Sequence, residues 1–280
     1  MRKDGTRGVE GDGLGNRMKW YERQETARYL IPLLPIIIRL DGRAFHSFTK
    51  GLRKPWDQGL TDAMVQVTKN LVKETNARIG YTQSDEISLI ISYDEFSSEP
   101  YFNGKLFKIT SLLSSLAGIT FDRLIPEYLP TKVGRPPALF DCRVWNVPNK
   151  EEAVNYLIWR EQDAIRNSVS MAAQALFSHG QLMYKDVPTM KEMMLNLHGV
   201  DWNAYPAAFK QGTYVRRYEI QQELTKEAMA KLPEGMKNIT HVARSQIGPV
   251  QMPILTTIKN RVDVIFNDAP VVFKEPKPEL

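Results

Sequence analysis

The sequence contains one cysteine and four histidines among its 280 residues. The single cysteine, Cys142, excludes an internal disulfide and fits a reducing compartment, and so few histidines make a Cys/His zinc site improbable. The chain also has no run of about 18 apolar residues, and it begins without an apolar signal segment. We therefore expect neither export nor membrane insertion, and we expect a cytoplasmic protein.

Neither sign of charge dominates the chain. Lysine and arginine number 37 against 32 acidic residues, and the hydrophobic share of 42% is ordinary for a soluble globular enzyme. The small positive surplus suits a polyanionic partner such as nucleic acid without proving one. The length permits one sizeable core or two small cores that share an interface.

The first residues predict a mobile leader. Residues 1–16 are rich in glycine and charge, which does not favour a packed core. Their Gly11-x-Gly13-x-Gly15 pattern is not interpreted as a dinucleotide-binding motif, because no strand precedes it. A short helix is expected over 18–29.

The hydrophobic pattern then predicts the order strand, helix, strand, strand, helix, strand. Right-handed crossovers fold that order into a four-stranded antiparallel sheet, with the first and third strands adjacent and both helices on one face. This is a ferredoxin-like α+β fold. The expected strands are 35–40, 77–82, 86–93 and 138–147, and the helices are 57–75, capped by Asp57, and a second one from residue 103.

Two capping boxes predict further helices beyond this unit. Asn149 with Glu152 begins a long helix that reaches about residue 177, and Thr189 with Glu192 begins a shorter one that ends at Gly199. The predicted organisation is a leader over 1–16, a palm-like catalytic domain over 17–148, a helical region of the same unit over 149–232, and a C-terminal extension of unknown role over 233–280.

Acidic residues stand at the ends of two predicted central strands. Asp41 ends the first strand, and Asp85 with Glu86 begins the third, so the predicted sheet brings them side by side. An unpaired charge at the edge of a core is costly, and carboxylate oxygens are the ligands that magnesium prefers. Asp-Gly is also common turn chemistry, but the meeting of both acidic segments at one edge favours a two-metal phosphoryl-transfer site.

Residues around this pair suit a triphosphate. Gly42 has no Cβ and lets the backbone approach a metal or phosphate. The amides that follow Asp41, with Arg43 and His46 nearby, are able to cradle phosphates, and Lys54 adds a compact positive charge.

These residues belong to a set of motifs that resembles the tRNA-His guanylyltransferase superfamily. The resemblance extends from about residue 18 to residue 213. It implies a polymerase-palm domain that extends tRNA in the 3′-to-5′ direction, uses ATP, GTP and other nucleoside triphosphates with two Mg²⁺ ions, and assembles as a homotetramer. The motifs are Leu40-Asp41-Gly42-Arg43-x-Phe45-His46-x-Phe48, Lys54-Pro55-x-Asp57, Gln83-Ser84-Asp85-Glu86, Trp159-Arg160-x-x-Asp163 and Lys210-x-Gly212-Thr213.

The resemblance also implies roles for individual residues. Asp41, the Gly42 carbonyl and Asp85 would bind metal, and Asp41, Asp85 and Glu86 would be the catalytic residues. Residues expected to contact tRNA are Arg160, Asn167 and Lys210. Residues expected to bind nucleotide are Asp41, Gly42, Arg43, Ala44, Phe45, His46, Lys54, Asp57, Ser84 and Asp85.

One motif departs from the family pattern. Members that add a guanylate opposite no template base carry His-Ile-Asn-Asn shortly after the Trp-Arg pair, whereas here the window reads Ile165-Arg166-Asn167-Ser168. Only Asn167 is retained in register. The chain therefore resembles the guanylyltransferase-like branch, which prefers template-directed addition to 5′-truncated tRNAs; the alternative is addition of the extra 5′ guanylate to tRNA-His.

Two other classes fit parts of the pattern. A non-catalytic RNA-binding module with this element order needs stacking aromatics on its central strands, whereas 36–38 and 87–91 are largely aliphatic. Another palm enzyme, such as a nucleotide cyclase, would also hold magnesium on paired carboxylates.

Overall fold

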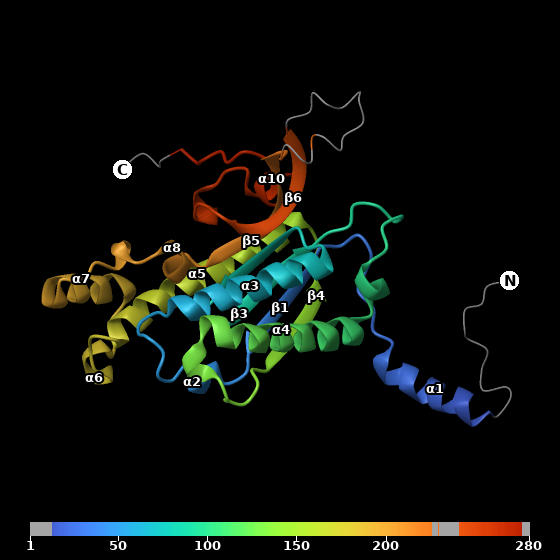
Figure 1. Cartoon of the computed structure of the whole chain (residues 1–280), viewed down its shortest axis with the longest axis horizontal. Helices are drawn as coiled ribbons and strands as arrows, with labels where there is room; N and C mark the ends of the chain where they lie inside the picture. Colours follow the sequence, from blue (N-terminus) through green and yellow to red (C-terminus); the bar gives the residue numbers. More distant parts are fainter. Residues whose placement is uncertain (1–12, 226–228, 230–240, 276–280) are drawn as a thin grey trace.

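The computed structural model describes residues 13–225, 229 and 241–275 of the chain. Within this part, an antiparallel sheet of six strands lies between two layers of helices (Figure 1). The strand order is β4-β1-β3-β2-β5-β6. The strands are β1 (Ile36–Gly42), β2 (Ile79–Gln83), β3 (Glu86–Ile91), β4 (Phe140–Asn146), β5 (Thr213–Glu223) and β6 (His241–Val250).

The α+β class is confirmed, and so is the pairing of the first and third strands. β1 runs antiparallel to β3, from Ile36 opposite Ile91 to Asp41 opposite Glu86. The prediction of only four strands was wrong, because β5 pairs with β2 and β6 pairs along β5. Most of β5 beyond Val215 is exposed, so it lacks an alternating apolar signal, and long-range pairing defines it.

One face of the sheet packs against α3 (Gln58–Thr75) and α4 (Leu106–Tyr128). α3 begins where predicted, because the Asp57 carboxylate accepts a hydrogen bond from the Leu60 amide at 3.1 Å. The buried residues of this core come from both helices and from alternate positions of the central strands. They include Ile36, Ile38, Leu40, Leu71, Ile87, Leu89, Leu113 and Phe121.

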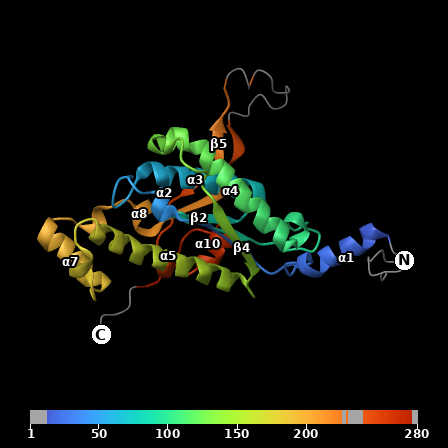
Figure 2. The same ribbon diagram turned by 90° about the horizontal axis from the view of Figure 1, so that it is seen from below.

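The opposite face packs against α5 (Lys150–Gln174) and α10 (Arg261–Phe266). The Asn149 side chain accepts a hydrogen bond from the Glu152 amide at 2.8 Å, so the predicted start of this helix is confirmed. Figure 2 shows α3 and α4 on one side of the sheet and α5 on the other. Both faces of the central strands are therefore covered, which explains why β1 is apolar at consecutive positions.

Shorter elements complete the described chain. Asp186, rather than Thr189, caps the helix that ends at Gly199, since its carboxylate accepts a hydrogen bond from the Thr189 amide. The remaining elements are α1 (Leu14–Thr26), α2 (Phe45–Phe48), α6 (His179–Leu182), α7 (Val187–His198), α8 (Ala207–Gln211), and 3-10 helices η1 (Tyr101–Gly104), η2 (Pro130–Lys132), η3 (Trp202–Ala204) and η5 (Leu255–Thr257).

Some predicted segments differ from the structure or lie beyond it. Residues 14–16, assigned to the leader, begin helix α1. Residues 1–12 of the predicted leader, and residues 233–240 and 276–280 of the predicted C-terminal extension, lie outside the described residues. In the part of the chain that the structure describes, no helix is both long enough and apolar enough to cross a membrane.

Candidate active site

The end of β1 and the β2–β3 turn bring the acidic residues together. Asp41 lies opposite Glu86 in the β1–β3 pairing, and the Gly42 amide donates a hydrogen bond to the Asp85 carbonyl at 3.1 Å. Ser84 turns the chain between β2 and β3 with a positive φ of 53°. The sheet edge predicted from the strand order therefore holds Asp41 and Asp85 as neighbours.

The two carboxylates form an electrostatically unfavourable pair. Burial raises the pKa of Asp85 to about 6, and the adjacent Asp41 carboxylate raises that pKa further. Partly buried carboxylates that repel each other are stabilised by a bound cation. Among the described residues no group of three or more His, Cys, Asp or Glu side chains is able to hold a metal. The neighbouring carboxylates of Asp41 and Asp85 fit magnesium, because this ion keeps water and phosphate as its remaining ligands.

Glu86 is held by an arginine from α5. The Arg160 guanidinium donates from Nε and Nη2 to the two Glu86 oxygens, at 2.6 and 2.7 Å. Both side chains are largely buried, with 12% and 15% exposed. Burial raises the pKa of Glu86, and the Arg160 hydrogen bonds act against that rise. Arg160, predicted to contact tRNA, is therefore placed inside the site, where it orients Glu86 and also contacts Asp163 at 3.2 Å.

The loop after Asp41 is fixed by one aromatic residue. Ala44 has a positive φ of 57° and precedes α2, whose Phe45 ring packs against Phe48, Phe121 and Phe140. A Cβ at Gly42 would lie 2.3 Å from Phe45 Cδ2, so glycine is required by this packing. Phe45, predicted to bind nucleotide, is a core residue that holds the loop in place.

The two polar residues of this loop remain accessible. The side chains of Arg43 and His46 are exposed, and the Arg43 amide donates to the Leu139 carbonyl at 2.8 Å. A hydrogen bond of 3.0 Å joins His46 Nε2 to Ser47 Oγ. This segment is free to approach a phosphate.

Two open cavities meet at Asp41, Ser84 and Asp85. One, of about 650 Å³, is lined by Gly42, Ala44, Phe45, His46 and Lys54, and the other, of about 300 Å³, is lined by Glu86, Arg160 and the α5 residues Asn167, Ser170 and Gln174. Met171 lines both cavities. The sequence reasoning missed Met171, although it follows Asn167 by four residues on the same face of α5.

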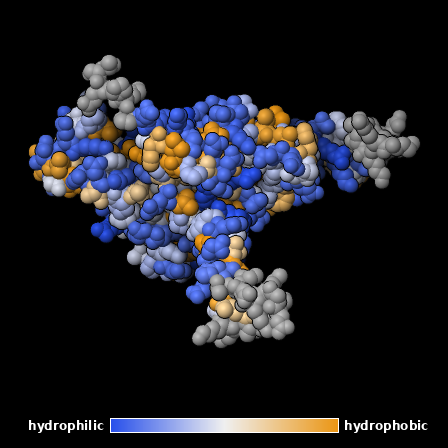
Figure 3. Space-filling model, turned by 90° about the horizontal axis from the view of Figure 1, so that it is seen from above, coloured by the Kyte–Doolittle hydropathy of each residue, from blue (hydrophilic) through white to orange (hydrophobic). Residues whose placement is uncertain are grey.

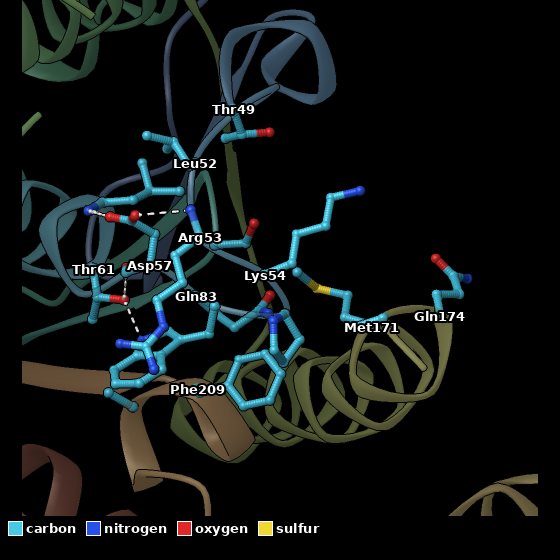
Figure 4. Close-up of a pocket in the computed structure, with 16 residues that line it drawn as sticks. Thr49, Leu52, Arg53, Lys54, Asp57, Thr61, Gln83, Met171, Gln174 and Phe209 are labelled. Carbon is cyan, nitrogen blue, oxygen red and sulfur yellow. Dashed lines mark hydrogen bonds between the residues drawn. The ribbon is translucent and has the colours of Figure 1, made fainter. Parts of the chain in front are cut away.

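A third, smaller cavity of about 210 Å³ adjoins them (Figure 4). The predicted nucleotide-binding residue Asp57 lines it, but its carboxylate is engaged with the backbone amides of Leu60 and Arg53 at 3.1 and 3.2 Å. Figure 4 shows that Lys54 extends away from Asp57. Lys54 lines this cavity and the one beside Asp41.

The predicted tRNA-contact residues separate in space. Asn167 lines the cavity that holds Asp85, and its amide lies 3.4 Å from the Asp163 carboxylate. Lys210 lines none of these three cavities. Its ammonium group instead donates to the Asn203 carbonyl at 2.6 Å and lies over the Trp202 ring.

Comparisons with known proteins show what this chain is similar to. The family model for tRNAHis guanylyltransferase matches residues 15–148. An uncharacterized protein of Acanthamoeba polyphaga mimivirus is 30% identical over 79% of this chain and 82% of its own length. The tRNA(His) guanylyltransferase of Saccharomyces cerevisiae is 28% identical over 73% of this chain and 92% of its own.

Solved structures show the same likeness. A bacterial tRNA(His) guanylyltransferase-like protein in complex with ATP superposes with a TM-score of 0.74 at 32% identity, over 91% of this chain and 99% of the other. Its counterpart in complex with GTP gives a TM-score of 0.69 at 32% identity, over 90% and 97%. The fold is that of a family of nucleotidyltransferases that act on tRNA. The chain belongs to the tRNA(His) guanylyltransferase superfamily, as the motifs around Asp41 and Asp85 predicted.

Proposed function

We propose that the protein adds nucleotides to the 5′ end of tRNA in the 3′-to-5′ direction, directed by the opposing template strand. The observation that carries this proposal is the placement of Asp41 beside Asp85 at the β1–β3 edge, where two open cavities meet. The complexes of similar bacterial proteins with ATP and GTP support nucleoside triphosphates as the substrates.

The residues at this edge suit magnesium. Asp41, Asp85 and the Gly42 carbonyl would hold it, as the family resemblance implies, and the structure supports this because Asp41 and Asp85 are neighbours at the sheet edge. Bound Mg²⁺ supplies activation of the attacking oxygen and neutralises charge on the leaving phosphate. Arg160 donates two hydrogen bonds to Glu86, which favour its ionised form and fix the side chain beside the pair.

The reaction has two steps. The tRNA 5′-monophosphate attacks the α-phosphorus of ATP and releases pyrophosphate, and the 3′-hydroxyl of the incoming nucleotide then attacks the activated 5′ phosphate and releases AMP. His46 and Lys54 line the larger cavity, and the exposed Arg43 belongs to the same loop as His46. These three side chains would bind the triphosphate. Asp57 would affect nucleotide binding only indirectly, because its carboxylate caps the start of α3, three residues after Lys54.

The window 165–168 supports templated addition. Ser168 is buried, and its hydroxyl donates to Ile165 O at 2.8 Å and accepts from the Trp202 indole at 3.2 Å. Arg166 pairs with Asp163, so Asn167 is the one residue of the window that lines the site. A single amide offers little means of choosing guanine, and base choice is then left to pairing with the template.

The structure also bears on the alternative of a non-catalytic RNA-binding module. Modules of this kind stack RNA bases on an open face of the sheet. Here α3 and α4 cover one face of β1 and β3, and α5 covers the other. No comparable platform exists on these two strands.

The assay compares two substrates with the wild-type protein. A tRNA lacking its first 5′ nucleotide is incubated with ATP, Mg²⁺ and single nucleoside triphosphates, and extension is read at the 5′ end. We expect efficient addition of only the nucleotide complementary to the opposing base, and at least tenfold slower guanylate addition to full-length tRNA-His. Equal rates on both substrates contradict templated addition, and no extension of either contradicts the proposed function.

A further inference from the structure

Lys132 is a buried lysine that the proposed mechanism does not use. It ends η2 and is 2% exposed. Lysine is almost never fully buried unless it is paired, and it normally lies on a mostly hydrophilic surface such as the face shown in Figure 3. None of the ion pairs between described residues includes Lys132. A buried charge without a carboxylate partner is costly, so the contacts of its ammonium group indicate what keeps it there.

The ammonium group of Lys132 reaches the loop that joins α2 to α3. Its Nζ donates a hydrogen bond to the Lys50 carbonyl at 2.6 Å and lies 5.6 Å from the centre of the Phe48 ring. Burial lowers the pKa of Lys132, the Arg135 charge lowers it further, and the Asp57 charge raises it. Hydrogen bonds from a charged donor are stronger than those between neutral groups. Lys132 therefore fixes the backbone of the loop at residue 50.

The same loop forms one wall of the open cavities. Residues 49–54 contain no helix or strand. Residues 49–51 and Lys54 line the cavity beside Asp41, and residues 52–57 line the smaller adjoining cavity. A segment without regular structure keeps a single conformation only where its contacts outweigh the entropy of ordering it. The position of Lys54 in both cavities therefore depends on how this loop is held.

Two charged side chains hold the loop, one on each side of Leu52. The Arg53 amide donates to the Asp57 carboxylate at 3.2 Å, as a dashed line in Figure 4 shows. Lys132 holds the Lys50 carbonyl on the other side. These two hydrogen bonds are fixed points of the backbone, and the segment between them leads directly into the site.

The anchor of Lys132 is rigid. The Lys132 amide donates to the Leu129 carbonyl and the Leu129 amide donates to the Ile125 carbonyl, both at 2.8 Å. Leu129 and Ile125 are 2% and 7% exposed, so η2 is fixed to the end of α4 at the core. Lys132 itself lines none of the three cavities at the site. Its effect on a bound nucleotide therefore passes through the loop.

We propose that Lys132 is a positioning residue that holds the loop 49–54 so that Lys54 meets the bound triphosphate. This inference rests on the proposed function, which assigns the triphosphate to the cavity beside Asp41. A pre-organised loop loses less entropy when the nucleotide binds, and a displaced loop weakens the contacts that Lys54 makes. Lys54 would contact the triphosphate before and during the reaction, so the effect is expected in KM rather than in kcat.

Steady-state 5′ extension at varied ATP concentration tests the proposal. Lys132→Met removes the nitrogen donor and keeps a stem of similar length, so the buried position stays filled. The variant should raise the KM for ATP about tenfold and change kcat less than threefold. Lys132→Arg, which retains a charged donor, should lie closer to the wild type. Lys73→Met, at an exposed lysine of α3 that lines none of the three cavities, should match the wild type. An unchanged KM for ATP in Lys132→Met overturns the proposal.

Hydrogen exchange without nucleotide gives a readout that does not depend on activity. Peptides that cover residues 49–54 should exchange at least tenfold faster in Lys132→Met than in the wild type, whereas peptides of α4 should be unchanged. Unchanged exchange in the loop, or faster exchange throughout the chain, overturns the proposal. A loop that loosens in Lys132→Met supports the anchoring even if the wild type extends no tRNA, a result that contradicts only the proposed function.

Discussion

Glu161 should make the stability of this protein depend on pH. Its side chain is fully buried on α5, where it accepts hydrogen bonds from the Tyr214 hydroxyl at 3.2 Å and the Leu255 amide at 2.9 Å. Burial raises the pKa of Glu161 from 4.5 to about 7. Glu161 thereby joins α5 to β5 and to η5 through a carboxyl group that is costly to ionise.

The sign follows from the raised pKa. Below pH 4.5 the group is protonated in both states, and its full stabilising contribution is present. As the pH rises through 7, the unfolded chain has already lost the proton, and this contribution to the free energy of unfolding is lost. A shift from 4.5 to about 7 corresponds to about 3 kcal/mol.

The test uses Glu161→Gln, whose amide can satisfy both hydrogen-bond partners without a charge. Urea unfolding of both proteins is measured from pH 4.5 to 8, and the variant should gain about 3 kcal/mol relative to wild type over that range. The raised pKa values of Asp85 and Glu86 affect both proteins and cancel in the difference. Parallel pH profiles would refute the reasoning.

Glu161→Ala, which leaves a buried amide unpaired, should lose about 1–3 kcal/mol or more of stability even at low pH.

Three further substitutions test individual contacts. Arg160→Lys replaces a two-point contact with Glu86 by a single charge and should slow 5′ extension about tenfold or more; an unchanged rate would show that the guanidinium is not needed. Asp57→Ala removes a helix cap and should cost about 1–2 kcal/mol in urea unfolding, whereas Asp57→Asn should lose less; equal losses would contradict the capping role. Gly42→Ala places a Cβ 2.3 Å from Phe45 and should destabilise by about 1–3 kcal/mol in thermal unfolding; an unaltered melting temperature would show that the ring moves freely.

The central sheet edge was predictable because its signals are local. Each element boundary near the site has a local signal: the apolar run of β1 ends at Asp41, Asp57 caps α3, and Asn149 caps α5. The order of the elements then places β1 beside β3. The family motifs identified the superfamily by themselves. The placement of Asp41 beside Asp85 could therefore be predicted from the sequence alone.

Other features depend on contacts between distant segments. β5 and β6 carry mostly exposed residues, so no apolar pattern predicted that they extend the sheet. A glutamate on a helix surface and a buried one are indistinguishable in sequence, and Glu161 was missed for that reason. Arg160 was assigned to RNA because its partner Glu86 is 74 residues away.

The most direct test of the central account is single-turnover 5′ extension of a truncated tRNA by Asp41→Asn and Asp85→Asn. Asp62→Asn is the matched control, because Asp62 is a partly exposed residue of α3 that lines none of the three cavities. Each site variant removes one carboxylate charge from the proposed metal site, so its rate should fall at least a hundredfold, on the order of 3 kcal/mol in the activation barrier. Asp62→Asn should retain the wild-type rate. Extension at near wild-type rate by either Asp41→Asn or Asp85→Asn would contradict the assignment of this carboxylate pair as the catalytic centre.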